Sequence, residues 1–265
     1  MTAATEPFMP KLGWVQGPDD PRTLRLSAYT ADTLPTAPKS QSWMKKASRW
    51  PLLGNDRIGD CVLVSCAHLV QGWTAYSRDA ESLVAEADVI GAYSAITGYD
   101  PKRTSRDGSN PTDRGTNSLA ALNFWRRTGI GGHKISAYMK LDPSDHNEVR
   151  NAANLFGGIY IAAQLPLAAN DQFRAGKTWT ATGGQRGRRG SWGGHAMHLG
   201  AYGTTGYTVS TWGRTQALTV GWWNTYVDEA FAVVSEDWLN QLGGTNPLGF
   251  DLTAMLADLR RVTAA

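Results

Sequence analysis

The sequence predicts an α+β fold in which helices come first and strands follow. Apolar residues recur at helical spacing between about residues 61 and 157. After residue 158 the pattern changes to short stretches rich in β-branched and aromatic residues, separated by turns. Helices and strands that are segregated along a chain are typical of this class. The cleft between the two halves is the expected place for a functional site.

Four helices are predicted, over residues 61–77, about 80–96, from 116 or 117 to 129, and from 142 to 157. Asp79 is the expected N-cap of the second helix, and Gly98 is its stop signal. Asn117 or Thr116 caps the third helix. Pro143 occupies the first position of the fourth helix, where its missing N–H costs nothing.

Five strands are predicted, over residues 159–163, 196–203, 206–212, 217–222 and 229–234. The expected organisation is an extended N-terminal arm, a helical lobe, a β-rich lobe and a C-terminal tail or helix, over residues 1–50, 51–157, 158–242 and 243–265. Five prolines interrupt the arm and no helical period persists in it. We interpret it as a strap packed over the body or as a docking arm for a partner.

The composition excludes several classes of protein. Hydrophobic residues make up 42% and charged residues 18% of 265 residues, which is enough apolar material for a sizeable core. A net charge of +3 is too small to indicate nucleic-acid binding. We see no signal peptide and no apolar run of membrane-spanning length. Two cysteines make no disulfide framework, which favours a reducing, cytoplasmic location.

Cys61 is the candidate nucleophile, because it follows Gly59-Asp60 at the start of the first predicted helix. A thiolate attacks carbonyl groups, and both a helix N-terminus and a nearby imidazolium lower the pKa of a thiol. His195 follows two glycines and begins a predicted strand, so it is the candidate general base and acid.

Two further side chains are expected to support this pair. Asn55, in the turn that leads to Cys61, is the candidate side-chain donor of an oxyanion hole, together with the Cys61 N–H. Ser210 and Trp212 are two residues apart on a predicted strand and therefore share a face. Ser210 is the candidate group that orients the imidazole of His195, and Trp212 would shield their hydrogen bond from water.

In order and spacing these motifs resemble the papain-like cysteine peptidases. That family has glutamine six residues before its cysteine and glycine two before it, the places of Asn55 and Gly59. Its histidine strand resembles residues 195–203, and its Asn-Ser-Trp-Gly motif resembles residues 210–213. The resemblance covers roughly residues 50–240. It implies a helical lobe facing an antiparallel sheet or barrel, and hydrolysis of peptide or isopeptide bonds through a Cys-His site without a cofactor.

Two departures from the family keep alternatives open. Asn55 is shorter than glutamine, and Ser210 replaces asparagine. They favour a second hypothesis, an inactive papain-like protein that serves as a structural or adaptor component, for example of a phage particle. A third hypothesis is a bacterial cell-wall cysteine endopeptidase, in which His198 would be the base.

The remaining expectations concern ligands and location. His195 and His198 are three residues apart on a strand and point to opposite faces, so they make a poor metal-chelating pair. The expected partners are a protein or peptide substrate, and an assembly contact through the N-terminal arm. The basic segment 183–190 is interpreted as a solvated loop, with a flap over the cleft or a contact to an acidic ligand as alternatives. The resemblance to minimal bacterial and phage forms implies a bacterial cytoplasm or a virion.

Overall fold

The structure is a computed structural model, and it describes residues 10–28, 36–78 and 80–238. Six α-helices in these residues are α1 (Cys61–Ser77), α2 (Glu86–Thr97), α3 (Ser118–Arg127), α4 (His146–Leu155), α5 (Leu167–Arg174) and α6 (Val220–Tyr226). Short 3-10 turns are η1 (Leu26–Ala28), η2 (Pro101–Arg103) and η3 (Gln185–Gly187). The predicted C-terminal tail or helix lies outside the described residues, as does Asp79. No helix within the described ranges is long and apolar enough to cross a membrane.

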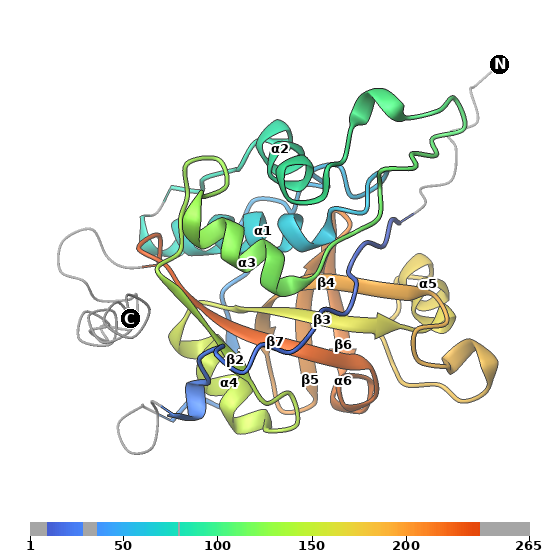
Figure 1. Cartoon of the computed structure of the whole chain (residues 1–265). Helices are drawn as coiled ribbons and strands as arrows, with labels where there is room; N and C mark the ends of the chain where they lie inside the picture. Colours follow the sequence, from blue (N-terminus) through green and yellow to red (C-terminus); the bar gives the residue numbers. More distant parts are fainter. Residues whose placement is uncertain (1–9, 29–35, 79, 239–265) are drawn as a thin grey trace.

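One antiparallel sheet forms the other layer. Its strands are β1 (Gln41–Ser42), β2 (Ala137–Leu141), β3 (Ile159–Leu165), β4 (Gly193–Tyr202), β5 (Gly206–Thr211), β6 (Arg214–Thr219) and β7 (Val227–Val234). The strand order is β2-β7-β3-β4-β5-β6, and β1 pairs with β4. Helices α1, α2 and α3 lie on one side of this sheet, and α4 lies on the other (Figure 1). The predicted α+β architecture is confirmed.

Helix α1 is the central element of the molecule. It packs on β4 and is buried over most of its circumference, from Cys61 to Ala75. A helix that is surrounded on all sides is apolar all round rather than amphipathic. Because β4 carries His195 and α1 begins at Cys61, this single packing contact brings together residues 134 positions apart in the chain.

The boundaries of two helices differ from the prediction for local reasons. Helix α2 begins at Glu86 rather than near residue 80, and the acidic residues of its first turn favour that start. It ends at Gly98 in the left-handed conformation, as predicted. Helix α4 begins at His146 because the carboxylate of Asp145 accepts hydrogen bonds from two backbone N–H groups of the first turn. Pro143 lies in the preceding turn.

Two strands and two α-helices were not predicted, namely β1, β2, α5 and α6. The predicted strand over 217–222 ends at Thr219, because the Thr219 hydroxyl accepts a hydrogen bond from the Trp222 N–H and caps α6. Strand β2 comes before residue 157 in the chain and pairs with β7 along its whole length. The sheet therefore draws on both halves of the sequence.

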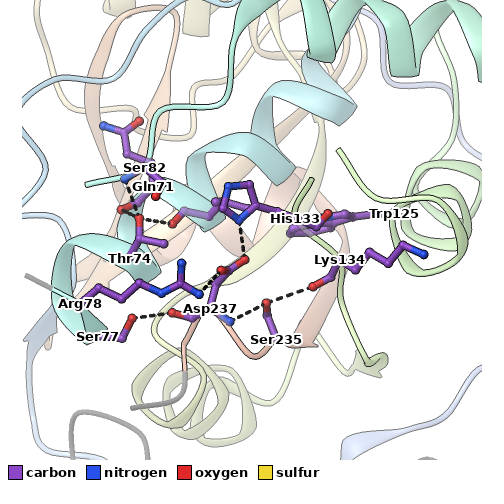
Figure 2. A network of polar contacts seen from close by, with 11 residues as sticks. Gln71, Thr74, Ser77, Arg78, Ser82, Trp125, His133, Lys134, Ser235 and Asp237 are labelled. Atoms are coloured by element: carbon purple, nitrogen blue, oxygen red, sulfur yellow. Dashed lines mark hydrogen bonds and ion pairs between the residues drawn. The ribbon is translucent and has the colours of Figure 1, made fainter. Parts of the chain in front are cut away.

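A polar network holds the C-terminal end of α1 against the chain that follows β7 (Figure 2). The Arg78 guanidinium and Nδ1 of His133 each lie 2.8 Å from the carboxylate of Asp237. The Ser77 hydroxyl donates to the Asp237 backbone carbonyl at 2.5 Å. Asp237 is 6% exposed, and its carboxylate is satisfied on both oxygens.

Candidate active site

Cys61 is the first residue of α1, and its sulfur faces the start of β4. The backbone N–H of Ala196 lies 3.5 Å from Cys61 Sγ and points toward it. The first N–H groups of any helix lack carbonyl partners within the helix, so the end of α1 directs positive potential at this sulfur. Both Cys61 and Cys66 are free thiols, in agreement with the prediction that they do not bridge.

His195 directly precedes Ala196 and is held on two sides. Its Nε2 lies 2.7 Å from the Thr211 hydroxyl oxygen. The Trp212 indole stacks on the imidazole with ring centroids 4.0 Å apart and planes 15° apart. Its Nδ1 is buried, and no hydrogen-bond partner for it occurs among the described residues. The hydroxyl and the indole fix the ring orientation and leave Nδ1 as the nitrogen free for chemistry.

Ser210 does not occupy the place that the sequence analysis gave it. Its hydroxyl lies 2.9 Å from Nδ1 of His68 and 3.1 Å from Nδ1 of His198, in a separate buried cluster. The prediction assumed a continuous strand through Trp212, but β5 ends at Thr211 and Trp212 has a positive φ of 41°. The turn breaks the alternation that placed Trp212 on the face of Ser210. Ser210 lies opposite His198 in the pairing of β4 with β5, so Thr211 is on the face of His195 and contacts it instead.

The same cluster contains the alternative base, His198. Nε2 of His68 lies 2.9 Å from the Pro51 carbonyl, so this nitrogen must carry the proton and Nδ1 must accept one. The Ser210 hydroxyl then donates to His68 and accepts from Nδ1 of His198. Burial lowers the pKa of His68 to about 4 and that of His198 to about 3, which keeps both rings neutral at pH 7. Trp50 packs against both rings.

Asn55 is buried in the loop before α1, and its side-chain amide donates to the Ile58 carbonyl at 3.0 Å. Its backbone carbonyl accepts a hydrogen bond from the Lys11 N–H. The amide thus stabilises the turn that leads into α1. None of the side-chain hydrogen bonds found for Asn55 in the described part of the chain involves Cys61.

Asp60 is fully buried beside Cys61, and its carboxylate makes no hydrogen bond that meets standard geometry within the described residues. Burial, with the nearby charge of Asp113, raises the pKa of Asp60 well above its ordinary value. Asp60 is the N-cap residue of α1, but its side chain makes no capping hydrogen bond. The carboxylate of Asp113 instead accepts the Gly59 N–H. A protonated Asp60 avoids placing a negative charge next to the thiol.

The N-terminal arm covers this site. Gly13 and Trp14 both donate their backbone N–H groups to the Gly194 carbonyl, at 3.2 and 3.1 Å. On the opposite wall, Thr116 donates to the Gly13 carbonyl, and Val15 donates to the Thr116 carbonyl. In Figure 1 the dark-blue segment descends past the end of α3 and crosses β3 and β7 in the view shown. Residues 10–15 therefore form a strap that bridges the two walls above Cys61.

Glycines on both walls allow the strap to lie this close. A Cβ on Gly13 would overlap the Gly59 carbonyl, and one on Gly115 would overlap the Gly13 carbonyl. A Cβ on Gly194 would overlap the Trp14 carbonyl. The strap position depends on Gly13, Gly115 and Gly194 having no side chain.

Burial under the strap sets the protonation state of the pair. It raises the pKa of Cys61 to about 12, against the lowering effect of backbone N–H groups from Ala196, Gly13 and Trp14. It lowers the pKa of His195 to about 3. The thiol and the imidazole are therefore both neutral at pH 7. The covered site holds no thiolate, and without one the sulfur is a poor nucleophile.

Sequence reasoning missed Thr211 and the role of the strap. The glycines at 13, 59, 115 and 194 were visible, but their pairing across the cleft depends on the fold. No group of three or more metal-ligating side chains lies together in the residues that the structure describes.

The comparisons place this arrangement among known folds. A structure of xylellain, a cysteine protease from Xylella fastidiosa, has a TM-score of 0.63 at 10% identity and covers 88% of this chain and 99% of its own. A structure of digestive procathepsin L 3 from Tenebrio molitor has a TM-score of 0.51 at 15% identity, and the match covers 77% of this chain and 71% of the other. A structure from a study of the mite allergens Blo t 1 and Der p 1 has a TM-score of 0.51 at 17% identity, and the match covers 77% of this chain and 73% of the other. No family model matches the sequence, and no curated protein does.

At these identities the similarity establishes the fold, which is that of the papain-like cysteine proteases. The resemblance noted from the motifs is confirmed at this level. The roles of individual residues depend on the geometry of this chain.

Proposed function

We propose that the protein is a papain-like cysteine hydrolase that cleaves peptide or isopeptide bonds and is latent while residues 10–15 cover its site. Cys61 is the nucleophile and His195 the general base and acid. Thr211 orients the imidazole, and the N–H groups at the start of α1 stabilise the oxyanion, with Asn55 supporting the turn that positions them. The observation that carries the proposal is the placement of the Cys61 sulfur at a helix N-terminus, against the backbone N–H of the residue that follows His195. Nδ1 of His195 has no hydrogen-bond partner among the described residues, whereas its Nε2 is held by Thr211.

The mechanism begins when the strap leaves. Water then reaches the thiol and the imidazole, which removes most of the desolvation that opposes charge on both groups. The Cys61 proton passes to Nδ1 of His195, and the thiolate attacks the substrate carbonyl. The imidazolium returns the proton to the leaving amine. Water, deprotonated by the same nitrogen, then hydrolyses the thioester and regenerates the thiol.

Gly13→Val tests the proposal in the full-length protein, because a side chain at this position pushes the strap away from the Gly59 carbonyl. We expect iodoacetamide to label Cys61 at pH 6 on the order of 100-fold faster than in the wild type, since thiolate content rises tenfold for each unit by which the thiol pKa falls. Gly203→Val is the matched control, because a Cβ there meets open space. Cys66 in the same helix is the internal control for unfolding.

Added substitutions in the Gly13→Val background identify the base. His195→Ala should abolish the reactivity of Cys61 at pH 6, and His198→Ala should retain it. Loss with His198→Ala alone would support the cell-wall endopeptidase hypothesis. Labelling of Cys61 no faster than that of a free thiol would contradict the proposed enzyme and favour the structural or adaptor role.

A further inference from the structure

The side chain of Trp14 fills a pocket beside the candidate nucleophile. Trp14 is 3% exposed, although it belongs to a strap that has no helix or sheet of its own. Its ring lies close to Gly194, where an added Cβ would come within 2.7 Å of the Trp14 Cε3 atom. The missing side chain at Gly194 makes room for a planar group next to His195.

The floor of this pocket is polar and directional. The Trp14 indole N–H donates to the Ser118 hydroxyl oxygen at 3.0 Å. The Ser118 hydroxyl in turn donates to the carboxylate of Glu229 at 2.5 Å. Glu229 also lies within hydrogen-bonding reach of the Trp14 side chain. Because the Ser118 hydroxyl donates its proton to Glu229, its oxygen is left to accept a hydrogen bond from whatever fills the pocket. The occupant must therefore supply a donor.

A second buried group faces the same floor. The hydroxyl of Tyr160 has no hydrogen bond of standard geometry within the described residues, yet Ser118 and Glu229 are both near enough to influence its pKa. Tyr160 is fully buried on β3. An unpartnered buried hydroxyl beside a donor-requiring site indicates that the floor is built for a polar contact rather than for an aliphatic side chain.

We propose that the Trp14 pocket is a substrate subsite that selects a tryptophan side chain close to the scissile bond, with Ser118 and Glu229 as its specificity-determining residues. This inference rests on the proposed function, because the pocket adjoins Cys61. Trp14 is then a built-in occupant of the subsite, and its departure with the strap exposes the pocket to substrate. An aliphatic occupant leaves the acceptor of Ser118 unpaired, which lowers its affinity relative to an indole.

Full-length Trp14→Ala protein tests the pocket without requiring catalysis. We expect indole to bind this variant and raise its melting temperature, whereas indene, which has CH₂ in place of N–H, binds about tenfold more weakly, as expected for one lost hydrogen bond. Adding Ser118→Ala should remove most of this preference. The wild type, whose pocket is filled, should bind neither compound. Equal affinity for indole and indene, or no binding to folded Trp14→Ala protein, would overturn the inference.

A second measurement covers the case in which Trp14→Ala does not fold. The Gly13→Val protein should hydrolyse a peptide mixture with about tenfold preference for substrates that place tryptophan, rather than leucine or arginine, in this pocket. Hydrolysis without such a preference overturns the subsite and leaves the proposed function intact. Binding of indole to a protein that never hydrolyses peptides contradicts only the proposed function.

Discussion

The two ends of helix α1 differ in whether the buried polar groups around them have hydrogen-bond partners. At the C-terminal end, the Asp237 carboxylate satisfies Arg78 and His133 together. At the N-terminal end, both carboxylate oxygens of Asp60 and Nδ1 of His195 are buried without a standard hydrogen bond among the described residues. Buried unpaired groups cost stability, and they concentrate where a protein has a function other than stability. The same helix is thus anchored at one end and bordered by unsatisfied polar groups at the other.

The strap explains how the unsatisfied end is tolerated. Backbone hydrogen bonds from residues 13–15 bridge the walls above Cys61, and Trp14 adds a large buried ring. This burial stabilises the closed state and keeps the thiol and imidazole neutral. The anchored end needs no such cover, because its charges compensate one another.

Breaking the anchored end should have the largest effect on stability. Asp237→Ala leaves Arg78 and His133 without their shared acceptor, and we expect a loss of about 3 kcal/mol in the free energy of unfolding. Urea denaturation at pH 7 measures it. Asp20→Ala is the matched control, because its ion pair with Arg22 is exposed and its removal should produce no measurable change. A loss no larger than that of the control would refute the description of this end as an anchor.

Substitutions at the adjacent positions 210 and 211 distinguish the candidate active site from the buried cluster of His68, His198 and Ser210. Ser210→Ala removes the hydroxyl between His68 and His198 and should cost about 2 kcal/mol of stability while leaving the reactivity of Cys61 unchanged. Thr211→Val should cost about 1 kcal/mol, and should slow labelling of Cys61 about tenfold in the Gly13→Val background. The reverse assignment of the two effects would restore Ser210 as the residue that orients His195.

The smallest expected effect is a pH dependence at the unsatisfied end. Because burial raises the pKa of Asp60, the folded state retains a proton that the unfolded chain loses above its ordinary pKa of 3.8. Its contribution to stability is therefore complete below pH 3.8 and is lost as pH rises toward the folded-state pKa. Asp60→Asn cannot ionise and so does not lose stability in this way. The difference in urea midpoint between Asp60→Asn and the wild type should therefore shift in favour of the variant as the pH is raised from 5 to 8. A constant difference would show that Asp60 does not titrate in this way.

Local patterns were sufficient to predict much of the fold. The bounds of α1 and the stop at Gly98 are as predicted, because helical periodicity and glycine in the left-handed conformation are properties of short segments. Strands β1 and β2 and helices α5 and α6 were missed because each is short. Such elements depend on pairing and packing rather than on their own propensity.

In the candidate site, too, some features follow from local sequence and others depend on contacts between distant segments. Local order in the sequence was enough to single out Cys61 and His195 as candidates, because a thiol before a helical period and a histidine entering a strand are visible there. Only the tertiary structure decided that Thr211 rather than Ser210 contacts His195, because the pairing of β4 with β5 sets Ser210 opposite His198 and so places Thr211 on the other face, that of His195. It also decided that residues 10–15 cover Cys61. That contact joins segments far apart in the chain through glycines whose close approach no local pattern encodes.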